Sequence, residues 1–141
     1  MTADAGAHGA PLRILIVLPS PPLRVLAAAA LRAALARTGR DVRLTEAGSG
    51  LDALWLAART PPDLAVVALD LPILSGDELV ALFRARPGLG DLPVVAVAPA
   101  SDPEAPRRAA AAGAAALLTT PFDVEAIAAA FAAAGLFGSA P

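Results

Sequence analysis

The strongest constraint on the fold of this chain is a regular alternation of short apolar runs with longer helical segments. The first apolar run, residues 12–18, reads LRILIVL, and four runs of similar length follow it. Short, nearly continuous apolar runs are typical of strands that are buried on both faces of a sheet. The five predicted strands span residues 12–18, 42–47, 64–69, 93–98 and 115–119.

Each predicted strand is followed by a segment of helical character. Ala and Leu dominate most of these segments, and Pro or Gly stands at the junctions, where helices begin and end. Short connections between alternating strands and helices indicate right-handed βαβ units and a parallel sheet covered on both faces. The sequence therefore predicts an α/β, flavodoxin-like, doubly wound fold with five parallel strands in the order 2-1-3-4-5 and five helices. The predicted helices span residues 23–37, 51–59, 76–86, 106–112 and 124–134.

The length of 141 residues and the apolar content of 57% fit one folded domain and exclude global disorder. We expect a loose tail over residues 1–11, a domain over residues 12–135 and a short tail over residues 136–141. The net charge of −2 gives no reason to expect a nucleic acid or an anionic membrane as a partner. No uninterrupted apolar run approaches the ~20 residues that span a bilayer, and residues 1–11 lack the features of a signal peptide. We therefore expect a cytoplasmic domain without a membrane partner.

Several kinds of chemistry are excluded or disfavoured by the residue types present. The chain contains no Cys, which excludes disulfides and thiol catalysis, and no lysine. The only histidine, His8, lies in the predicted N-terminal tail. The first strand-to-helix turn, residues 18–22, has no Gly-rich phosphate cradle, and Ser20 within it has no neighbouring base to activate it. We therefore expect no enzymatic activity.

Short motifs at the junctions carry a recognisable pattern. The residues are Pro62-Asp63-Leu64, Leu71-Pro72, Ser75-Gly76, Glu78-Leu79, Leu92-Pro93-Val94-Val95, Ala112-Gly113-Ala114 and Thr120-Pro121-Phe122-Asp123. Their joint spacing, over residues 13–134, resembles the receiver domain of bacterial response regulators, the CheY-like family. The resemblance implies a role in two-component phosphorelay signalling.

In that family a histidine kinase donates a phosphoryl group to an Asp at the end of strand three. Two acidic residues after strand one join this Asp in holding Mg²⁺, which prefers carboxylate oxygens and neutralises the transferring phosphoryl group. A Thr or Ser at the end of strand four and a Lys before the Pro that follows strand five hold the phosphoryl oxygens. An aromatic residue in strand five reports the switch.

This sequence departs from the family pattern at every chemical position. The acidic pair falls on Leu18 and Pro19, and the phosphoacceptor falls on Ala68. The Thr or Ser position is Ala98, and the Lys position is Thr120. The aromatic switch position is Leu117. The resemblance therefore predicts a degenerate phosphorylation pocket with no metal, the Mg²⁺ site of the family being lost. It also predicts a cis peptide bond before Pro121.

Asp70 keeps an alternative open. It lies two residues beyond Ala68, and a slip of two residues along a strand preserves the side-chain face. Asp70 could then be a phosphoacceptor, although it would still lack the acidic pair and the Lys. The other interpretation is a loop Asp that orders the turn.

Two groups of residues are candidate partner surfaces. Leu51, Trp55 and Arg59 share one stripe of their predicted helix. Trp55 is either an exposed anchor for a partner or a ring folded over the sheet edge near the second strand. Arg107 and Arg108 form either a solvated basic edge or a partner contact. The better inward face of the Trp55 helix consists of Ala53, Leu54 and Ala57.

Three aspartates lie near predicted helix starts, where carboxylates cap exposed N–H groups or interact with the helix dipole. We interpret Asp77, Asp102 and Asp123 in this way, as local stabilisers and not as ligands.

The sequence as a whole predicts a stand-alone receiver-like domain that acts as a phosphorylation-independent pseudo-receiver. Its partner would be a histidine kinase, another regulator or a second copy in a homodimer. One alternative is a phosphorylatable regulator that uses Asp70. The other is a small α/β enzyme or nucleotide binder that shares only the fold.

Overall fold

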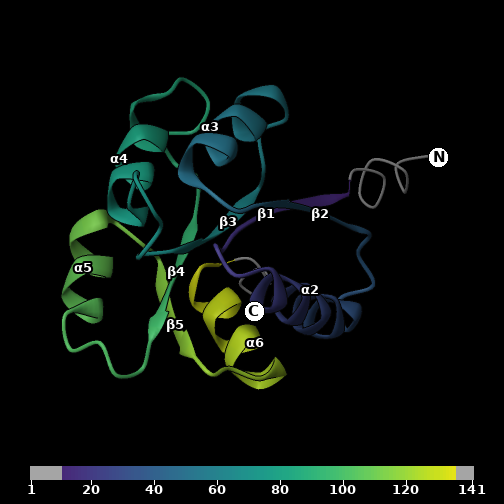
Figure 1. Cartoon of the computed structure of the whole chain (residues 1–141). Coiled ribbons are helices and arrows are strands. Elements are labelled where there is room, and N and C mark those ends of the chain that lie inside the picture. Colours follow the sequence, from purple (N-terminus) through teal and green to yellow (C-terminus); the bar gives the residue numbers. More distant parts are fainter. Residues whose placement is uncertain (1–10, 136–141) are drawn as a thin grey trace.

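A computed structural model describes residues 11–135 (Figure 1). Five parallel strands form one sheet in the order β2-β1-β3-β4-β5, which confirms the predicted topology. The strands are β1 (Leu12–Val17), β2 (Val42–Ala47), β3 (Leu64–Ala68), β4 (Val94–Pro99) and β5 (Ala116–Thr120). Of the two predicted tails, only Pro11 belongs to the described residues.

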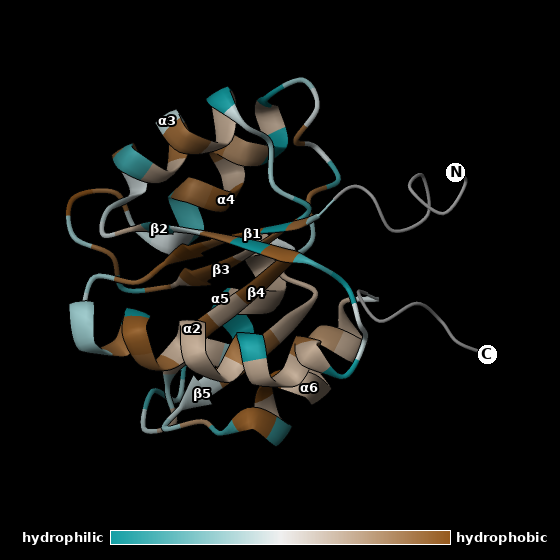
Figure 2. Ribbon diagram, turned by 90° about the vertical axis from the view of Figure 1, so that its right-hand side faces the viewer, coloured by the Kyte–Doolittle hydropathy of each residue, from teal (hydrophilic) through white to brown (hydrophobic). Residues whose placement is uncertain are grey.

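Five helices cover the two faces of the sheet. They are α2 (Pro21–Ala36), α3 (Gly50–Arg59), α4 (Gly76–Ala85), α5 (Ala105–Ala112) and α6 (Val124–Ala133). In Figure 1, α2 and α6 lie on one face, and α3, α4 and α5 lie on the other. Figure 2 shows the largely apolar central strands between these two helical layers. This arrangement places every βα turn at the edge of the sheet where the strands end.

The burial of each strand follows its place in the sheet. All five residues of the central strand β3 are buried, as its unbroken apolar sequence predicts. The edge strand β2 exposes Arg43 and Thr45 between less exposed apolar residues, so it alternates in the way expected of a strand covered mainly on one side. Phe83 of α4 and Phe131 of α6 fill the core on opposite faces. Among residues 11–135, no polar or charged residue is buried.

Side-chain caps begin most of the helices. Ser20 accepts a hydrogen bond from the Leu23 N–H at the start of α2. The predicted start of this helix at residue 23 is therefore two residues late, because prolines fit the first helical turn that Ser20 caps. Asp123 accepts from the Ala126 N–H, which confirms its predicted role as a cap.

For Asp77, the prediction of a cap or a dipole partner is confirmed in its second form, because Asp77 is an acidic residue of the first turn of α4. Ser75 caps α4 and forms a capping box with Glu78, so Asp77 lies inside the first turn of the helix and is not its cap. Asp102 accepts from the Glu104 N–H in the turn before α5, while Glu104 itself occupies the cap position. Both carboxylates also face an arginine from α5, described below.

Within residues 11–135, every helix is too short or insufficiently apolar to cross a lipid bilayer. The longest, α2, has 16 residues and contains Arg24 and Arg32.

Candidate functional site

The ends of β1, β3 and β4 form an apolar surface where the family resemblance would place charged groups. Leu18, directly after β1, is fully buried, and Ala68 at the end of β3 is only 8% exposed. Ala98 of β4 is also buried, while Pro19 is exposed. None of these side chains carries a proton donor, a nucleophile or a metal ligand. The carboxyl edge of the sheet, which usually binds ligands in doubly wound folds, therefore offers no catalytic group at these positions.

Gly76 explains one part of the family spacing in physical terms. Its N–H donates to the Leu69 carbonyl at 2.9 Å, which brings the start of α4 against the end of β3. A Cβ at this position would lie 2.2 Å from the Ala68 carbonyl oxygen, far inside a normal contact distance. Only glycine allows the backbones to approach so closely. The backbone geometry at this edge of the sheet therefore requires the glycine of the family spacing.

The far side of this edge is formed by β5. The Thr120–Pro121 peptide bond is cis, which confirms the expectation from the resemblance. Thr120 is half-buried and pairs in register with Pro99 of β4. Leu117, at the expected aromatic switch position, packs against a small apolar cluster that includes Ala98. The Lys position therefore holds a neutral hydroxyl, and the switch position holds an aliphatic side chain.

Asp70 lies beyond the strand and is not part of the sheet. The ladder of β3 ends at Ala68, paired with Val97, and the Leu69 N–H donates to the Val97 carbonyl. The Asp70 side chain is 64% exposed, and its Oδ1 accepts a hydrogen bond of 2.8 Å from Arg108 Nη1. Asp77 and Asp102 share this guanidinium with Asp70.

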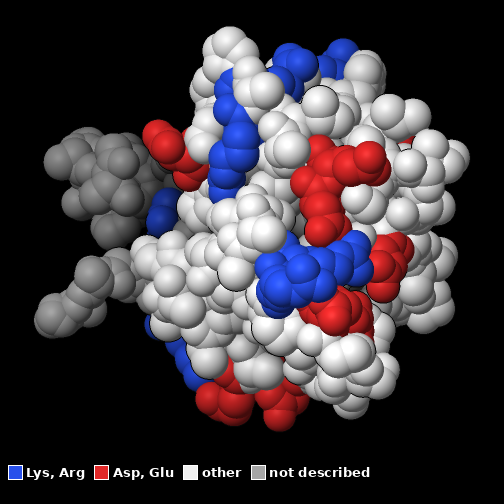
Figure 3. Space-filling view, turned by 90° about the vertical axis from the view of Figure 1, so that its left-hand side faces the viewer, with Lys and Arg blue, Asp and Glu red and all other residues white. Residues whose placement is uncertain are grey.

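Arg108 of α5 is the centre of a charged cluster that we call the Arg108 cluster, made of Arg108, Asp70, Asp77 and Asp102. Arg108 Nη2 donates to Asp77 Oδ1 at 2.6 Å and to the Leu69 carbonyl at 3.0 Å. Its Nε donates to Asp77 Oδ2 at 3.2 Å, and Asp102 Oδ2 lies 3.7 Å from Nη1. Figure 3 shows arginine side chains in blue with red acidic side chains on several sides. One guanidinium thus connects α5 to the β3–α4 loop and to the start of α4.

The electrostatics of the cluster follow from these contacts. The hydrogen bond from Arg108 lowers the pKa of Asp77 from its ordinary value, against a smaller opposing effect of burial. The hydrogen bonds to Asp77 and then to Asp70 raise the pKa of Arg108 above its already high value. Both partners are therefore held in their charged forms at neutral pH.

The structure changes the interpretation of the Arg107–Arg108 pair. Arg107 is exposed and pairs with Glu104 within the same helix turn, in agreement with a solvated basic edge. Arg108 is neither a solvated edge nor a free partner contact, because its guanidinium is occupied inside the chain. Sequence reasoning missed this cluster because Asp70 and Asp77 lie more than 30 positions before Arg108 and no local pattern links them to it.

The residues at this edge do not fit Mg²⁺. A hard cation needs several oxygen ligands that converge on one point. Leu18, Ala68 and Ala98 supply no side-chain oxygen, and the carboxylates of Asp70 and Asp77 accept from Arg108. In the described part of the chain, no group of three or more His, Cys, Asp or Glu side chains is arranged to hold a metal ion.

The outer side of α3 carries the other predicted surface. Trp55 is 60% exposed and Leu51 is 62% exposed, whereas Ala53 and Ala57 are buried. The Arg59 guanidinium carbon lies 4.5 Å from the centroid of the Trp55 ring, a cation–π contact. The tryptophan therefore faces solvent, and the alternative in which its ring folds over the sheet edge is wrong.

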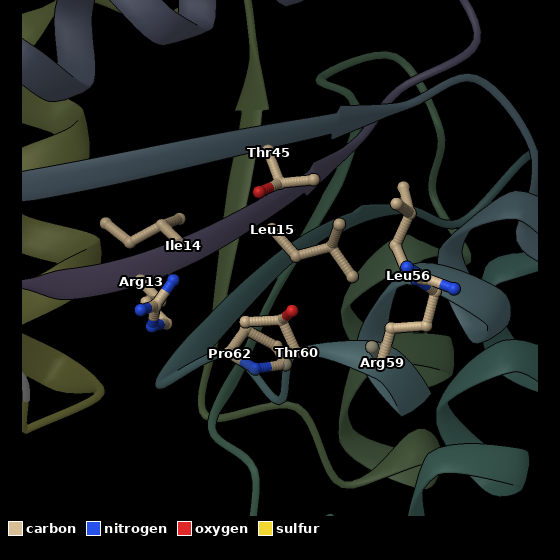
Figure 4. Close-up of a pocket in the computed structure, with 9 residues that line it drawn as sticks. Arg13, Ile14, Leu15, Thr45, Leu56, Arg59, Thr60 and Pro62 are labelled. Atoms are coloured by element: carbon tan, nitrogen blue, oxygen red, sulfur yellow. The ribbon is translucent and has the colours of Figure 1, made fainter.

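A cavity of about 160 Å³ lies beside the last turn of α3, near the start of β3. Leu56 and Arg59 line it from the helix, Leu15 from β1, and Thr60 and Pro62 from the connection to β3 (Figure 4). No sequence motif pointed to this cavity, since its walls come from elements that are distant in the chain.

Comparison with known proteins places the chain in a family. Residues 24–132, well over half of the chain, match the family model described as the response regulator receiver domain. A putative response regulator from Chloroflexus aurantiacus is 24% identical, with a TM-score of 0.78 over 89% of this chain and 99% of that chain. The chemotaxis response regulator CheY4 of Vibrio cholerae is 22% identical, with a TM-score of 0.76 and the same coverage.

A third similar structure provides a contrast at the site. The receiver domain of the sensor histidine kinase PA1611 from Pseudomonas aeruginosa is 23% identical, with a TM-score of 0.76 over 92% of this chain and 100% of that chain. That protein was solved with a magnesium ion coordinated in its active-site cleft. At these identities the structures show a shared fold, and the family match supplies the membership. With its sheet order, its glycine at the β3–α4 junction and its match over residues 24–132, this chain belongs to the response regulator receiver domains of two-component signalling.

Proposed function

We propose that this receiver domain is a phosphorylation-independent pseudo-receiver, which acts in two-component signalling through contacts with other proteins. The single observation that carries the proposal is the apolar, uncharged character of the site at the ends of β1, β3 and β4. In a cytoplasmic setting its partners would be a histidine kinase, another regulator or a second copy of this chain.

The chemistry of phosphoryl transfer explains why this observation matters. The reaction needs a nucleophilic oxygen, a cation that neutralises the developing charge, and donors that hold the phosphoryl oxygens. Ala68 has no nucleophile, Leu18 has no metal ligand, and Thr120 stands where the family has a lysine. The chain contains no lysine at all, so no other alignment can restore that group. We therefore propose that neither Mg²⁺ binding in the receiver sense nor any catalytic turnover belongs to this domain.

The competing function is phosphorylation on Asp70. The exposure of its carboxylate favours access by a phosphodonor. The Arg108 guanidinium disfavours this function, because its Nη1 already donates a hydrogen bond of 2.8 Å to Asp70 Oδ1. That bond engages the oxygen lone pair that would attack phosphorus. No acidic pair lies beside Asp70 in the sequence to bring a metal to it.

Intact-mass spectrometry after incubation with acetyl phosphate and Mg²⁺ tests the proposal. Asp70→Asn is treated in parallel, and a receiver domain that retains the acidic pair and the lysine serves as a control for the reagent. We expect no added phosphoryl mass on either form of this protein. A phosphorylated wild type with an unreactive Asp70→Asn variant would establish Asp70 as the acceptor, and phosphorylation of both would reveal another acceptor. Either result would overturn the proposal.

A further inference from the structure

The outer face of α3 displays two large apolar side chains that are more than half exposed. Leu51 and Trp55 are four positions apart, which places them next to each other on a helix. At about 100° per residue, Trp55 points directly away from the buried Ala53 and Ala57. An adjacent Leu and Trp, both more than half exposed, form a patch that differs from the single apolar residues scattered on most surfaces.

The same face carries a negative charge near one end of the helix and a positive charge near the other end. Asp52, in the first turn, is exposed and forms no ion pair with a described residue. Arg59, in the last turn, lies over the Trp55 ring, and its N–H groups at the edge of the guanidinium remain available to an acceptor. Along this face, Leu51 and the acidic Asp52 lie at the amino end, Trp55 lies in the middle and the basic Arg59 lies at the carboxyl end. Such an order is complementary to itself when it is reversed.

We propose that this face, made of Leu51, Asp52, Trp55 and Arg59 and here called the α3 face, binds the α3 face of a second copy in an antiparallel, two-fold symmetric dimer. The inference deepens the proposed function, on which it rests, by naming a second copy as a partner. When the two-fold axis crosses the helix between residues 55 and 56, Asp52 of each copy lies opposite Arg59 of the other. The contact is isologous, so the charge pair occurs twice and the tryptophans meet near the axis. The antiparallel helices also bring opposite dipole ends together.

The overall charge and the size of the face set the expected strength. A net charge of −2 gives little long-range repulsion between two copies. A single helix face buries less area than a standard stable interface, so the dimer belongs to the weak, transient class. We expect a dissociation constant in the range of about 10 µM to about 1 mM.

Trp55 is a natural reporter of this contact, because the chain contains one tryptophan and no tyrosine. Sedimentation equilibrium and tryptophan emission are measured on the same concentration series, from about 1 µM to about 2 mM. We expect the mass to rise toward that of a dimer while the emission shifts to shorter wavelength over the same range. High salt should weaken the transition, because exposed charge pairs are screened.

Charge reversals provide the decisive variants. Asp52→Arg alone and Arg59→Asp alone place like charges opposite each other twice, and each should weaken dimerisation at least tenfold. An equimolar mixture of these two variants should form a heterodimer, and the double variant should recover the homodimer. Arg32→Asp, a reversal on the exposed side of α2, should leave dimerisation unchanged. Circular dichroism of each variant checks that it is folded.

Three results would overturn the inference. The first is a monomer throughout the concentration range. The second is a dimer that neither single reversal weakens, which would place the contact on another face. The third is a failure of the two single variants to rescue each other when mixed. The phosphorylation assay above is independent, since a monomer that accepts no phosphoryl group refutes the dimer and leaves the proposed function intact.

Discussion

Two neighbouring regions at the carboxyl edge of the sheet differ in charge: one is apolar, and the other contains several paired charges. The region around Leu18 and Ala68 is apolar and almost completely buried. The Arg108 cluster, which begins two residues farther along the chain at Asp70, gathers one guanidinium and three carboxylates at a partly exposed position. The contrast shows that this domain has no uncompensated charge at its buried edge and uses paired charge to connect its loops. A phosphoryl switch needs the opposite arrangement, with like charges held together until a cation arrives.

The largest effect is expected when a charge is introduced into the apolar region. Ala68→Asp introduces a carboxylate at a buried position, where the only cation of the Arg108 cluster is already paired with other carboxylates. We expect the free energy of unfolding at pH 7 to fall by about 3 kcal/mol. Desolvation should raise the pKa of the new group in the folded state, so the loss should appear above the ordinary Asp pKa and shrink in acid. Urea denaturation at pH 4 and pH 7 measures it.

Ala68→Asn is the matched control for that experiment, because it adds a side chain of similar size without a charge. Its destabilisation should be smaller and independent of pH. Equal losses for the two variants at both pH values would mean that crowding, and not charge, limits this position.

The second test removes the cation of the Arg108 cluster. Arg108→Ala leaves Asp70 and Asp77 near each other without a counter-ion and leaves the Leu69 carbonyl without its donor, so we expect a loss of about 1–2 kcal/mol. Arg107→Ala, at the next position, removes only an exposed pair and should cost less than about 0.5 kcal/mol. Thermal and urea unfolding of both variants compare them directly. A similar effect for the two arginines would contradict the cross-linking role of Arg108.

The smallest expected effect concerns pH. Arg108 lowers the pKa of Asp77 in the folded state, so this pair contributes stability above the ordinary Asp value of 3.8 and loses it as the pH falls through the lower folded value. Because Asp77 is about one third exposed, the contribution should stay below about 1 kcal/mol. Stability measured from pH 6 to pH 2 should fall less steeply for Asp77→Asn than for the wild type. Identical acid profiles would show that the pair contributes nothing measurable.

Much of the fold could be predicted because its signals are local. Five apolar runs with Pro and Gly between them specify strands, helices and their alternation, and the rules for βαβ connections then limit the order of the strands. Gly76 and the cis bond before Pro121 also agree with expectations from the motif spacing. The predicted start of α2 was less accurate, since Ser and Pro residues compete for the same turn.

In the candidate site, too, features with local signals could be predicted and features formed by distant residues could not. The absence of lysine and the apolar residues at Leu18, Ala68 and Ala98 were evident in the sequence, because a missing functional group needs no geometry to be recognised. The ion pairs of Arg108 were not evident in the sequence, because its partners come from the β3–α4 loop, from α4 and from the turn before α5. The two interpretations of Trp55 were likewise separated only by the direction in which α3 packs.

By itself, the sequence determined the alternation of strands and helices, the resemblance to the family and the apolar residues at the ends of β1, β3 and β4. These properties depend on residue identity and on spacing along the chain. Only the tertiary structure decided that Arg108 pairs inside the chain, that Asp70 lies beyond the sheet, that Trp55 faces solvent, and that a cavity lies beside the last turn of α3. The reason is physical: ion pairs, burial and cavities depend on distances between elements that the backbone brings together, and those distances have no local signature in a single chain.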